Sequence, residues 1–200
     1  MRKLRELMDM DERVALVAGG AGHIGGAMCQ ALAELGATVA VLDLGDEACD
    51  RTAQALAGEY GIEAAALPLD IADETALRAL PGQLEERFGR LDVVVNCAAL
   101  VGTSALKGWT TPFAEQSSET WRLALETNLT APFVLIQSCA DLLRRSGNGS
   151  VINIGSMYGL LGPDMALYEG TDMGTPIAYA ASKGGLLQVT RWLATVLAPD

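Results

Sequence analysis

Residues 14–28 read VALVAGGAGHIGGAM, a short apolar run followed by a glycine-rich loop and the start of a helical pattern. Gly20, Gly22 and Gly25 have the spacing GxGxxG, and Gly19, Gly22 and Gly25 also fit GxxGxxG. Between a strand and a helix, glycines let the backbone approach a pyrophosphate, and the helix N-terminus offers unpaired N–H groups to the anion. The stretch therefore predicts a dinucleotide-binding loop. No GK[ST] follows it, which excludes a P-loop nucleotidase.

Two further residues of this loop, His23 and Ile24, are candidates for contact with the cofactor. His23 stands where a third small residue is expected, so its side chain could touch a phosphate. The alternative is a solvated spacer with no ligand, which is the commoner fate of a single histidine in a loop.

Asp43 ends the second apolar run, 18 residues beyond Gly25. A carboxylate at this place can accept hydrogen bonds from both ribose hydroxyls and would repel a 2′-phosphate. The segment VLDLGDEACD contains no Lys or Arg, so the sequence favours NAD over NADP. The alternative is that Asp43 only caps the helix that starts near Asp46.

Apolar runs and helical patterns alternate along the chain. The apolar runs are continuous, which indicates strands buried on both faces in a parallel sheet. Together they predict one α/β domain over residues 1–200, a Rossmann-like doubly wound parallel sheet with ligands at the carboxyl ends of its strands. The expected strands are Val14–Ala18, Thr38–Leu42, Ala64–Leu69, Leu91–Asn96 and Ser150–Ile154, and the expected helices are Ile24–Leu35, Asp46–Tyr60, Asp73–Phe88, a long one near Ser118–Arg145, and Ile177–Leu197. Residues 101–117 are expected to form a long loop, either a surface excursion or a wall of the pocket.

Composition excludes several classes of function. The formal net charge of −11 argues against a nucleic-acid partner, because little basic surface is left to neutralise phosphates. The four cysteines form no CxxC pair and there is one histidine, so no metal site is expected. No apolar run resembles a signal peptide or reaches the length of a membrane span. We therefore expect a cytoplasmic protein with reduced cysteines and no membrane partner.

Tyr179 and Lys183 form the pattern Y-x-x-x-K within YAASK. Residues four apart on a helix share a face, so the phenol and the ammonium can point into one pocket. A free tyrosine titrates near ~10, and a fixed cation nearby favours its phenolate form. Tyr168 has Asp172, a charge of the wrong sign, at the same spacing, and Tyr158 has a glycine there. Tyr179 is therefore the expected acid.

With these pieces in place, the chain resembles a short-chain dehydrogenase/reductase over essentially all 200 residues. The segments that carry the resemblance are AGGAGHIG, LPLDIAD, NCAA, NLTAPF, INIGS and YAASK. The resemblance implies that Asp70 and Ile71 border the adenine of NAD. It also implies that Asn96, Ala98 and Ala99 line the nicotinamide side.

The resemblance further assigns catalytic roles. Asn128 would hold a water that relays protons to Lys183, and Lys183 would also bind the nicotinamide ribose. Ser156 would hydrogen-bond the substrate oxygen while Tyr179 exchanges its proton. The alternatives are that Asn128 bonds backbone in its helix and that Ser156 is a turn residue at the end of a strand.

Three departures from the family are visible. Ala18 replaces the usual threonine, and His23 replaces a glycine of the pattern. Ser156 and Tyr179 are 23 residues apart, a wider spacing than is usual, and the extra PDMALYEGTD is expected to project over the pocket and contact a polar substrate. The chain also stops at WLATVLAPD, where relatives continue, so we expect a truncated product without the last strands and the substrate-covering segment.

The expected function is NAD(H)-dependent interconversion of a secondary alcohol and a ketone on a small polar, possibly sugar-derived, substrate. Two alternatives stay open, namely a non-catalytic dinucleotide-binding protein and a sugar-nucleotide epimerase or dehydratase that retains its NAD. Relatives dimerise through the helices that bear Asn128 and Tyr179. The apolar stretch LLQVTRWLATVL fits such a homo-oligomer and equally an intramolecular core.

Overall fold

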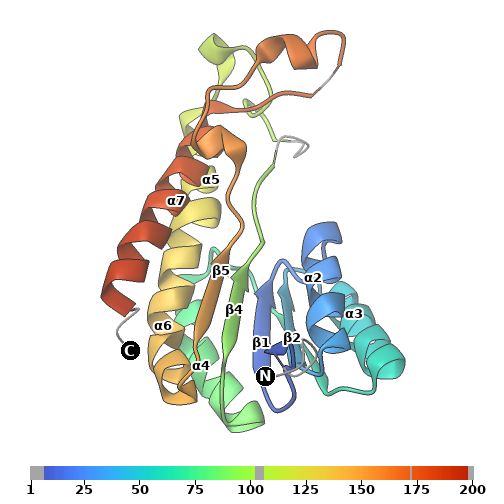
Figure 1. Cartoon of the computed structure of the whole chain (residues 1–200). Coiled ribbons are helices and arrows are strands. Elements are labelled where there is room, and N and C mark those ends of the chain that lie inside the picture. The colour runs from blue at the N-terminus through green and yellow to red at the C-terminus, as the bar shows by residue number, and fades with distance from the viewer. Residues whose placement is uncertain (1–6, 102–105, 172, 198–200) are drawn as a thin grey trace. The chain divides into compact units, whose positions relative to one another are not determined.

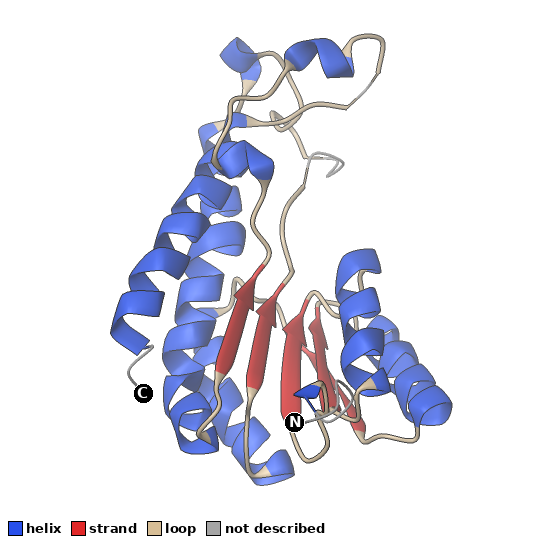
Figure 2. Ribbon diagram, in the orientation of Figure 1, coloured by secondary structure: helices blue, strands red, loops and turns tan. Residues whose placement is uncertain are grey.

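The computed structural model describes residues 7–101, 106–171 and 173–197. Its five strands form one sheet in the order β3-β2-β1-β4-β5, so β1 lies at the centre between β2 and β4 (Figures 1 and 2). The pairs β1/β2, β1/β4 and β2/β3 are parallel. The predicted doubly wound parallel sheet is confirmed. Its strands are β1 Val14–Ala18, β2 Thr38–Asp43, β3 Ala64–Pro68, β4 Val93–Asn96 and β5 Ser150–Asn153.

The strand that precedes the glycine loop is the best-buried part of the sheet. All five residues of β1 are buried, as expected for a central strand covered on both faces. Ala18 pairs in register with Leu42 of β2 and with Asn96 of β4. The carboxyl ends of these three strands are therefore level. The chain winds in opposite directions from β1 towards β2 and towards β4, so this edge is the switch point of the sheet.

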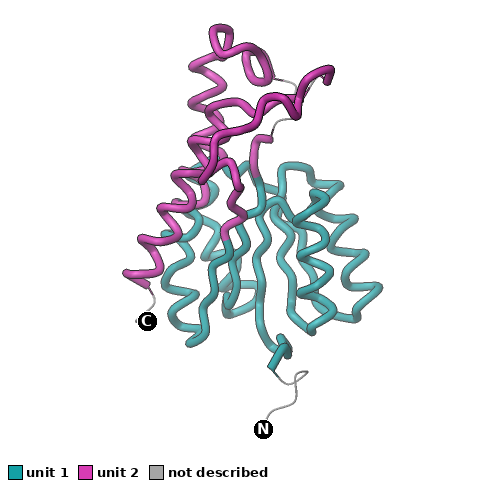
Figure 3. The backbone as a smooth tube through the Cα atoms, turned by 45° about the horizontal axis from the view of Figure 1, so that its top comes forward, with its two compact units in different colours: residues 1–98, 134–152 teal, residues 99–133, 153–200 magenta. Residues whose placement is uncertain are grey.

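Residue contacts divide the chain into two compact units, shown in Figure 3. Unit 1 comprises residues 1–98 and 134–152, and unit 2 comprises residues 99–133 and 153–200. Unit 1 carries the sheet and the helices α2 (His23–Glu34), α3 (Asp46–Tyr60), α4 (Glu74–Phe88) and α6 (Ala131–Ser146, from residue 134). Within it, Arg145 of α6 bonds Glu85 of α4 at 2.6 Å. The single domain expected over residues 1–200 remains a prediction.

Unit 2 holds two packed helices, α5 (Ser118–Leu125) and α7 (Ile177–Leu197). The long helix expected near Ser118–Arg145 is found as one helical stretch over residues 118–146. Its α-helical pattern breaks at a π turn, Glu126–Thr130, where the Ala131 N–H donates to the Glu126 carbonyl five residues earlier. Pro132 contributes to this break, because it has no N–H to continue the α-helical pattern. Trp109 is fully buried in unit 2, with its indole N–H 2.7 Å from the Val101 carbonyl.

Candidate active site

The glycine loop of unit 1 is packed backbone against backbone. Gly19 has a left-handed φ of 80°, and a Cβ there would lie 2.6 Å from the Ala98 amide nitrogen in the segment after β4. A Cβ at Gly25 would overlap the Gly19 carbonyl. Gly19 and Gly20 donate to the Leu42 carbonyl of β2 at 2.8 and 3.1 Å. Only glycine fits this course of the loop, and the resulting backbone cradle suits the close approach of a pyrophosphate.

Helix α2 starts directly behind this loop. Its N-cap is Gly22, which has no side chain to accept from the first-turn N–H groups. His23 and Ile24 are exposed in that first turn. The helix end therefore offers backbone donors to an anion, as predicted from the spacing of the glycines.

Asp43 is bonded to the loop and not to a helix. Its Oδ2 accepts from the Ala21 N–H at 3.1 Å, and its Oδ1 accepts from the Leu44 N–H at 2.8 Å. The N-cap of α3 is Gly45, so the alternative that Asp43 caps this helix is not what the structure shows. The carboxylate places a negative charge beside the glycine loop and retains lone pairs that can accept from hydroxyl groups.

The remaining candidates of unit 1 lie near the ends of β3 and β4. Asn96 is buried at the end of β4, level with Ala18. Ile71 is buried, whereas Asp70 is exposed and accepts from the Ala72 N–H at 2.9 Å, which shapes the turn before α4. Ala98 lies against the glycine loop, and Ala99 is the first residue of unit 2.

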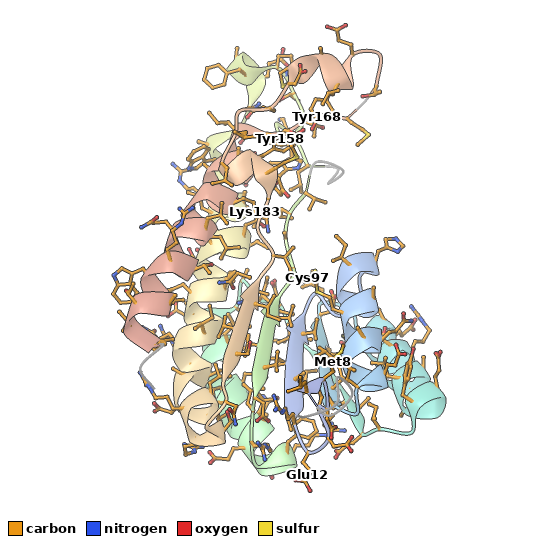
Figure 4. All side chains as sticks on the ribbon, viewed as in Figure 1. Met8, Glu12, Cys97, Tyr158, Tyr168 and Lys183 are labelled. Carbon is orange, nitrogen blue, oxygen red and sulfur yellow. The ribbon has the colours of Figure 1, made fainter. Side chains whose placement is uncertain are left out.

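Lys183 is the best-buried cation of the described residues, with 3% of its surface exposed. Its side chain is labelled in Figure 4. Its ammonium donates to the Ile154 carbonyl at 2.7 Å and lies 5.9 Å from the centre of the Tyr179 ring. The four-residue spacing on α7 thus places the ammonium and the phenol on one face, as predicted. The Tyr179 hydroxyl makes no hydrogen bond to any residue that the structure describes.

Ser156 follows the segment that receives Lys183. Its hydroxyl accepts from the Tyr158 N–H at 3.1 Å and caps the short turn Met157–Gly159, so the turn-residue alternative describes part of its role. Because the oxygen accepts in this bond, the hydroxyl hydrogen remains available to a substrate oxygen. The turn rests on α7, since a Cβ at Gly159 would lie 2.8 Å from the Lys183 carbonyl carbon.

Asn128 lies in the π turn and is 1% exposed. Its Oδ1 accepts from the Leu100 N–H at 2.7 Å, and its Nδ2 donates to the Leu100 carbonyl at 3.1 Å and to Ser182 Oγ at 3.1 Å. The side chain therefore bonds backbone of a neighbouring segment, not of its own helix. Its main-chain carbonyl is a better candidate for a bound water, because the residue four positions on is Pro132, which has no N–H.

The other two tyrosines between residues 155 and 184, Tyr158 and Tyr168, bond each other, which the sequence did not predict. Tyr158 Oη lies 2.8 Å from Tyr168 Oη, and Tyr168 Oη lies 2.6 Å from Thr175 Oγ1. The hydrogen bond to Tyr168, together with desolvation, raises the pKa of Tyr158. Ser182 and Gly159 are further contributors to the site that no motif identified.

Other kinds of site find no support in the described ranges. No group of three or more His, Cys, Asp or Glu side chains there could hold a metal ion. No helix there has the length and apolar character that crossing a bilayer requires.

Comparisons with known proteins match this architecture. Residues 13–200 match the family model described as short chain dehydrogenase. D-threitol dehydrogenase of Mycolicibacterium smegmatis is 30% identical over 92% of this chain and 64% of its own length. An NAD+-bound xylitol dehydrogenase structure has a TM-score of 0.82 at 28% identity, over 95% of this chain and 66% of that one. The Pseudomonas aeruginosa RhlG/NADP complex has a TM-score of 0.78 at 33% identity, over 96% and 68%. The chain thus spans less than two thirds of its first curated relatives.

Proposed function

The chain belongs to the short chain dehydrogenase family, and from this premise we propose that it is an oxidoreductase interconverting a secondary alcohol and a ketone with a nicotinamide dinucleotide. The observation that carries the proposal is the buried ammonium of Lys183, which is fixed on the Ile154 carbonyl 5.9 Å from the Tyr179 ring. Burying a cation costs free energy that hydrogen bonding offsets only in part, so this placement supports a chemical role for the ammonium.

The proposed catalytic residues control the proton and the charge on the substrate oxygen. Tyr179 exchanges a proton with the substrate oxygen, and the neighbouring Lys183 ammonium stabilises the phenolate that this leaves. Ser156 donates its hydroxyl hydrogen to the same oxygen. When bound, the nicotinamide ring supplies the carbon that takes or gives the hydride. Asn128 holds the Leu100 segment with its side chain, and its main-chain carbonyl binds a water that relays protons to Lys183.

The glycine cradle and Asp43 fit a dinucleotide, and we propose NAD as the cofactor. Its contacts are assigned to Gly19, Gly20, Gly22, His23, Ile24, Gly25, Asp43, Asp70, Ile71, Asn96, Ala98, Ala99, Tyr179 and Lys183. Asp43 supports NAD because its carboxylate, held beside the loop by Ala21, repels a 2′-phosphate. A fluorescence titration should show tighter binding of NADH than of NADPH. Equal affinities would contradict the preference.

A small polyhydroxylated substrate is the proposed class. Its support comes from D-threitol dehydrogenase and xylitol dehydrogenase, whose names denote polyols. The extra segment PDMALYEGTD does not add to this support, because its Tyr168 hydroxyl bonds Tyr158 and Thr175 and its Leu167 is exposed.

The activity is tested by a Tyr179→Phe variant on a panel of threitol, xylitol and galactose with NAD+. We expect turnover to fall by about 10²-fold or more, with NADH affinity nearly unchanged. A variant that keeps most of its turnover would remove Tyr179 from the acid role. NADH binding without turnover in the parent chain would favour the non-catalytic alternative, and conversion without net NADH production would favour the epimerase or dehydratase.

We also propose a homo-oligomer that forms through α7 and the π turn. A groove of about 490 Å³ in unit 2 is lined by Leu129, Thr130, Phe133, Gly185, Gln188, Val189 and Trp192. Two of its lining side chains, Phe133 and Trp192, are 42% and 60% exposed, and a second copy would cover the apolar patch that they form. Light scattering should give at least a dimer, and a monomer would contradict this proposal.

A cytoplasmic location is proposed as well. Cys29, Cys49 and Cys139 are buried thiols, which fits a reducing compartment. Cell fractionation would test it.

A further inference from the structure

The segment between Ser156 and Tyr179 contains a chain of three hydroxyl groups. Tyr158 Oη, Tyr168 Oη and Thr175 Oγ1 are linked by contacts of 2.8 and 2.6 Å, and Figure 4 shows Tyr158 and Tyr168 side by side. All three side chains are half-buried. We call these three residues the hydroxyl chain.

Backbone groups at the two ends of the hydroxyl chain are bonded to the Ser156 hydroxyl and to the first turn of α7, which carries Tyr179. At one end, the Tyr158 N–H donates to Ser156 Oγ at 3.1 Å. At the other end, Thr175 is followed by Pro176, whose carbonyl accepts from the Tyr179 N–H at 3.0 Å. Four hydrogen bonds, together with the covalent structure of Tyr158 and of Thr175–Pro176, therefore link the Ser156 hydroxyl to the helix turn that carries Tyr179.

Burial does not account for the order of this segment. Leu160, Leu161 and Leu167 are 66%, 62% and 71% exposed. Gly170 has a left-handed φ of 75°. A connection of this length whose leucines are exposed loses much conformational entropy on ordering, so its specific hydrogen bonds contribute to where it lies.

Other contacts fix the two ends of this segment, and the hydroxyl chain connects those ends. Gly159 seats the Met157–Gly159 turn against Lys183, and the Gln116 side chain accepts from the Ile177 N–H at 3.2 Å at the start of α7. Each contact fixes one end of the segment. The hydroxyl chain is the bridge between the ends, and Tyr168 supplies the oxygen common to both of its bonds.

We propose that Tyr158, Tyr168 and Thr175 are positioning residues that hold the Ser156 hydroxyl and the Tyr179 phenol at a fixed separation across the 23-residue spacing. The inference rests on the proposed roles of Ser156 and Tyr179. Its physical basis is that the Tyr158 N–H binds the Ser156 hydroxyl directly, so a displacement of Tyr158 turns that oxygen.

Tyr168→Phe is the decisive variant, because it removes both bonds of the hydroxyl chain and keeps the ring. Hydrogen exchange of the Tyr158 amide should become about tenfold faster, which corresponds to the loss of about one hydrogen bond. With whichever polyol of the panel is turned over, kcat should fall about tenfold while KM changes less than about twofold. Tyr60→Phe, on α3 of unit 1, is the matched control and should change neither quantity.

Thr175 gives a second test that does not depend on the folding of Tyr168→Phe. Thr175→Val should lower kcat and accelerate the exchange, whereas Thr175→Ser keeps the hydroxyl and should retain the parent values. The double variant Tyr168→Phe/Thr175→Val should lose no more than Tyr168→Phe alone, because both changes break the same bond.

The exchange measurement separates this inference from the proposed function. If the parent chain turns over no alcohol, the function fails, yet the Tyr158 amide still reports whether the hydroxyl chain holds the turn. Unchanged exchange in Tyr168→Phe, or an unchanged kcat in an active protein, would overturn the positioning role. So would equal losses in Thr175→Val and Thr175→Ser.

Discussion

Replacing Asn128 by alanine should destabilise the protein by about 3 kcal/mol. The side chain makes three hydrogen bonds, two of them to the N–H and carbonyl of Leu100 and one to Ser182 Oγ. Truncation leaves both Leu100 groups without their partner, and a group orphaned in this way costs about 1–3 kcal/mol. The two Leu100 groups together would cost about 2–6 kcal/mol. Because Leu100 is only half-buried, water can replace part of the lost bonding, so the expected loss lies in the lower half of that range.

The assay is chemical denaturation of the parent and two variants, followed by an activity measurement. Ser182→Ala is the matched control and should lose less, about 1–2 kcal/mol, because it removes the two bonds of the Ser182 hydroxyl but leaves both Leu100 groups bonded to Asn128. Asn128→Asp keeps the acceptor for the Leu100 N–H but faces the Leu100 carbonyl with a second acceptor, so its loss should be as large as that of alanine. An Asn128→Ala protein as stable as the parent, or a Ser182→Ala protein as unstable as Asn128→Ala, would refute the role assigned to this amide.

Three further predictions concern unit 1. Gly25→Ala should lower NADH affinity by about 1–3 kcal/mol, because its Cβ overlaps the loop backbone, whereas Gly26→Ala, whose Cβ meets nothing nearer than 3.6 Å, should bind NADH normally in a fluorescence titration. Asp43→Ser should lower the ratio of NADH to NADPH affinity at least about tenfold, since a 2′-phosphate no longer meets a carboxylate; an unchanged ratio would argue against the assigned contact. Burial raises the pKa of Cys29 and Cys139 to about 12, so below that pH both thiols stay protonated, and mass spectrometry should find them unalkylated by iodoacetamide in the native protein at pH 8.

Much of unit 1 could be predicted from the sequence because its signals are local. The five strands were placed to within two residues, since each is a continuous apolar run bounded by turn residues. The long helix near Ser118–Arg145 is also found over residues 118–146, and what was not predicted is the π turn inside it. Its apolar periodicity continues through residues 126–130, and the π turn there depends on Pro132 and on the bonds of Asn128 to a distant segment.

The parts of the site that could not be predicted are those made by side chains bonding across loops. The carboxylate of Asp43 was expected near a ribose, but its bond to the Ala21 N–H follows from the register of β1 and β2. The contact between the Met157–Gly159 turn and Lys183 could not be predicted, because no local sequence pattern shows that Gly159 packs against α7. The hydroxyl chain likewise joins residues 10 and 7 positions apart, in a segment with no regular periodicity.

The choice among the tyrosines shows why a spacing of four residues on a helix predicts the site better than a residue count through an irregular segment. Tyr168 lies 12 residues from Ser156 and Tyr179 lies 23 residues from it, whereas the charge four residues on favours Tyr179. A four-residue separation on a helix fixes two side chains on one face whatever precedes it, and Lys183 lies 5.9 Å from the Tyr179 ring. A twelve-residue separation in an irregular segment fixes no geometry, and both neighbours of the Tyr168 hydroxyl are other hydroxyl groups. An insertion can therefore change the number of residues between Ser156 and the proposed proton donor, Tyr179, without changing which residue is the donor. This requires that bonds such as those of Tyr168 hold the inserted residues in place.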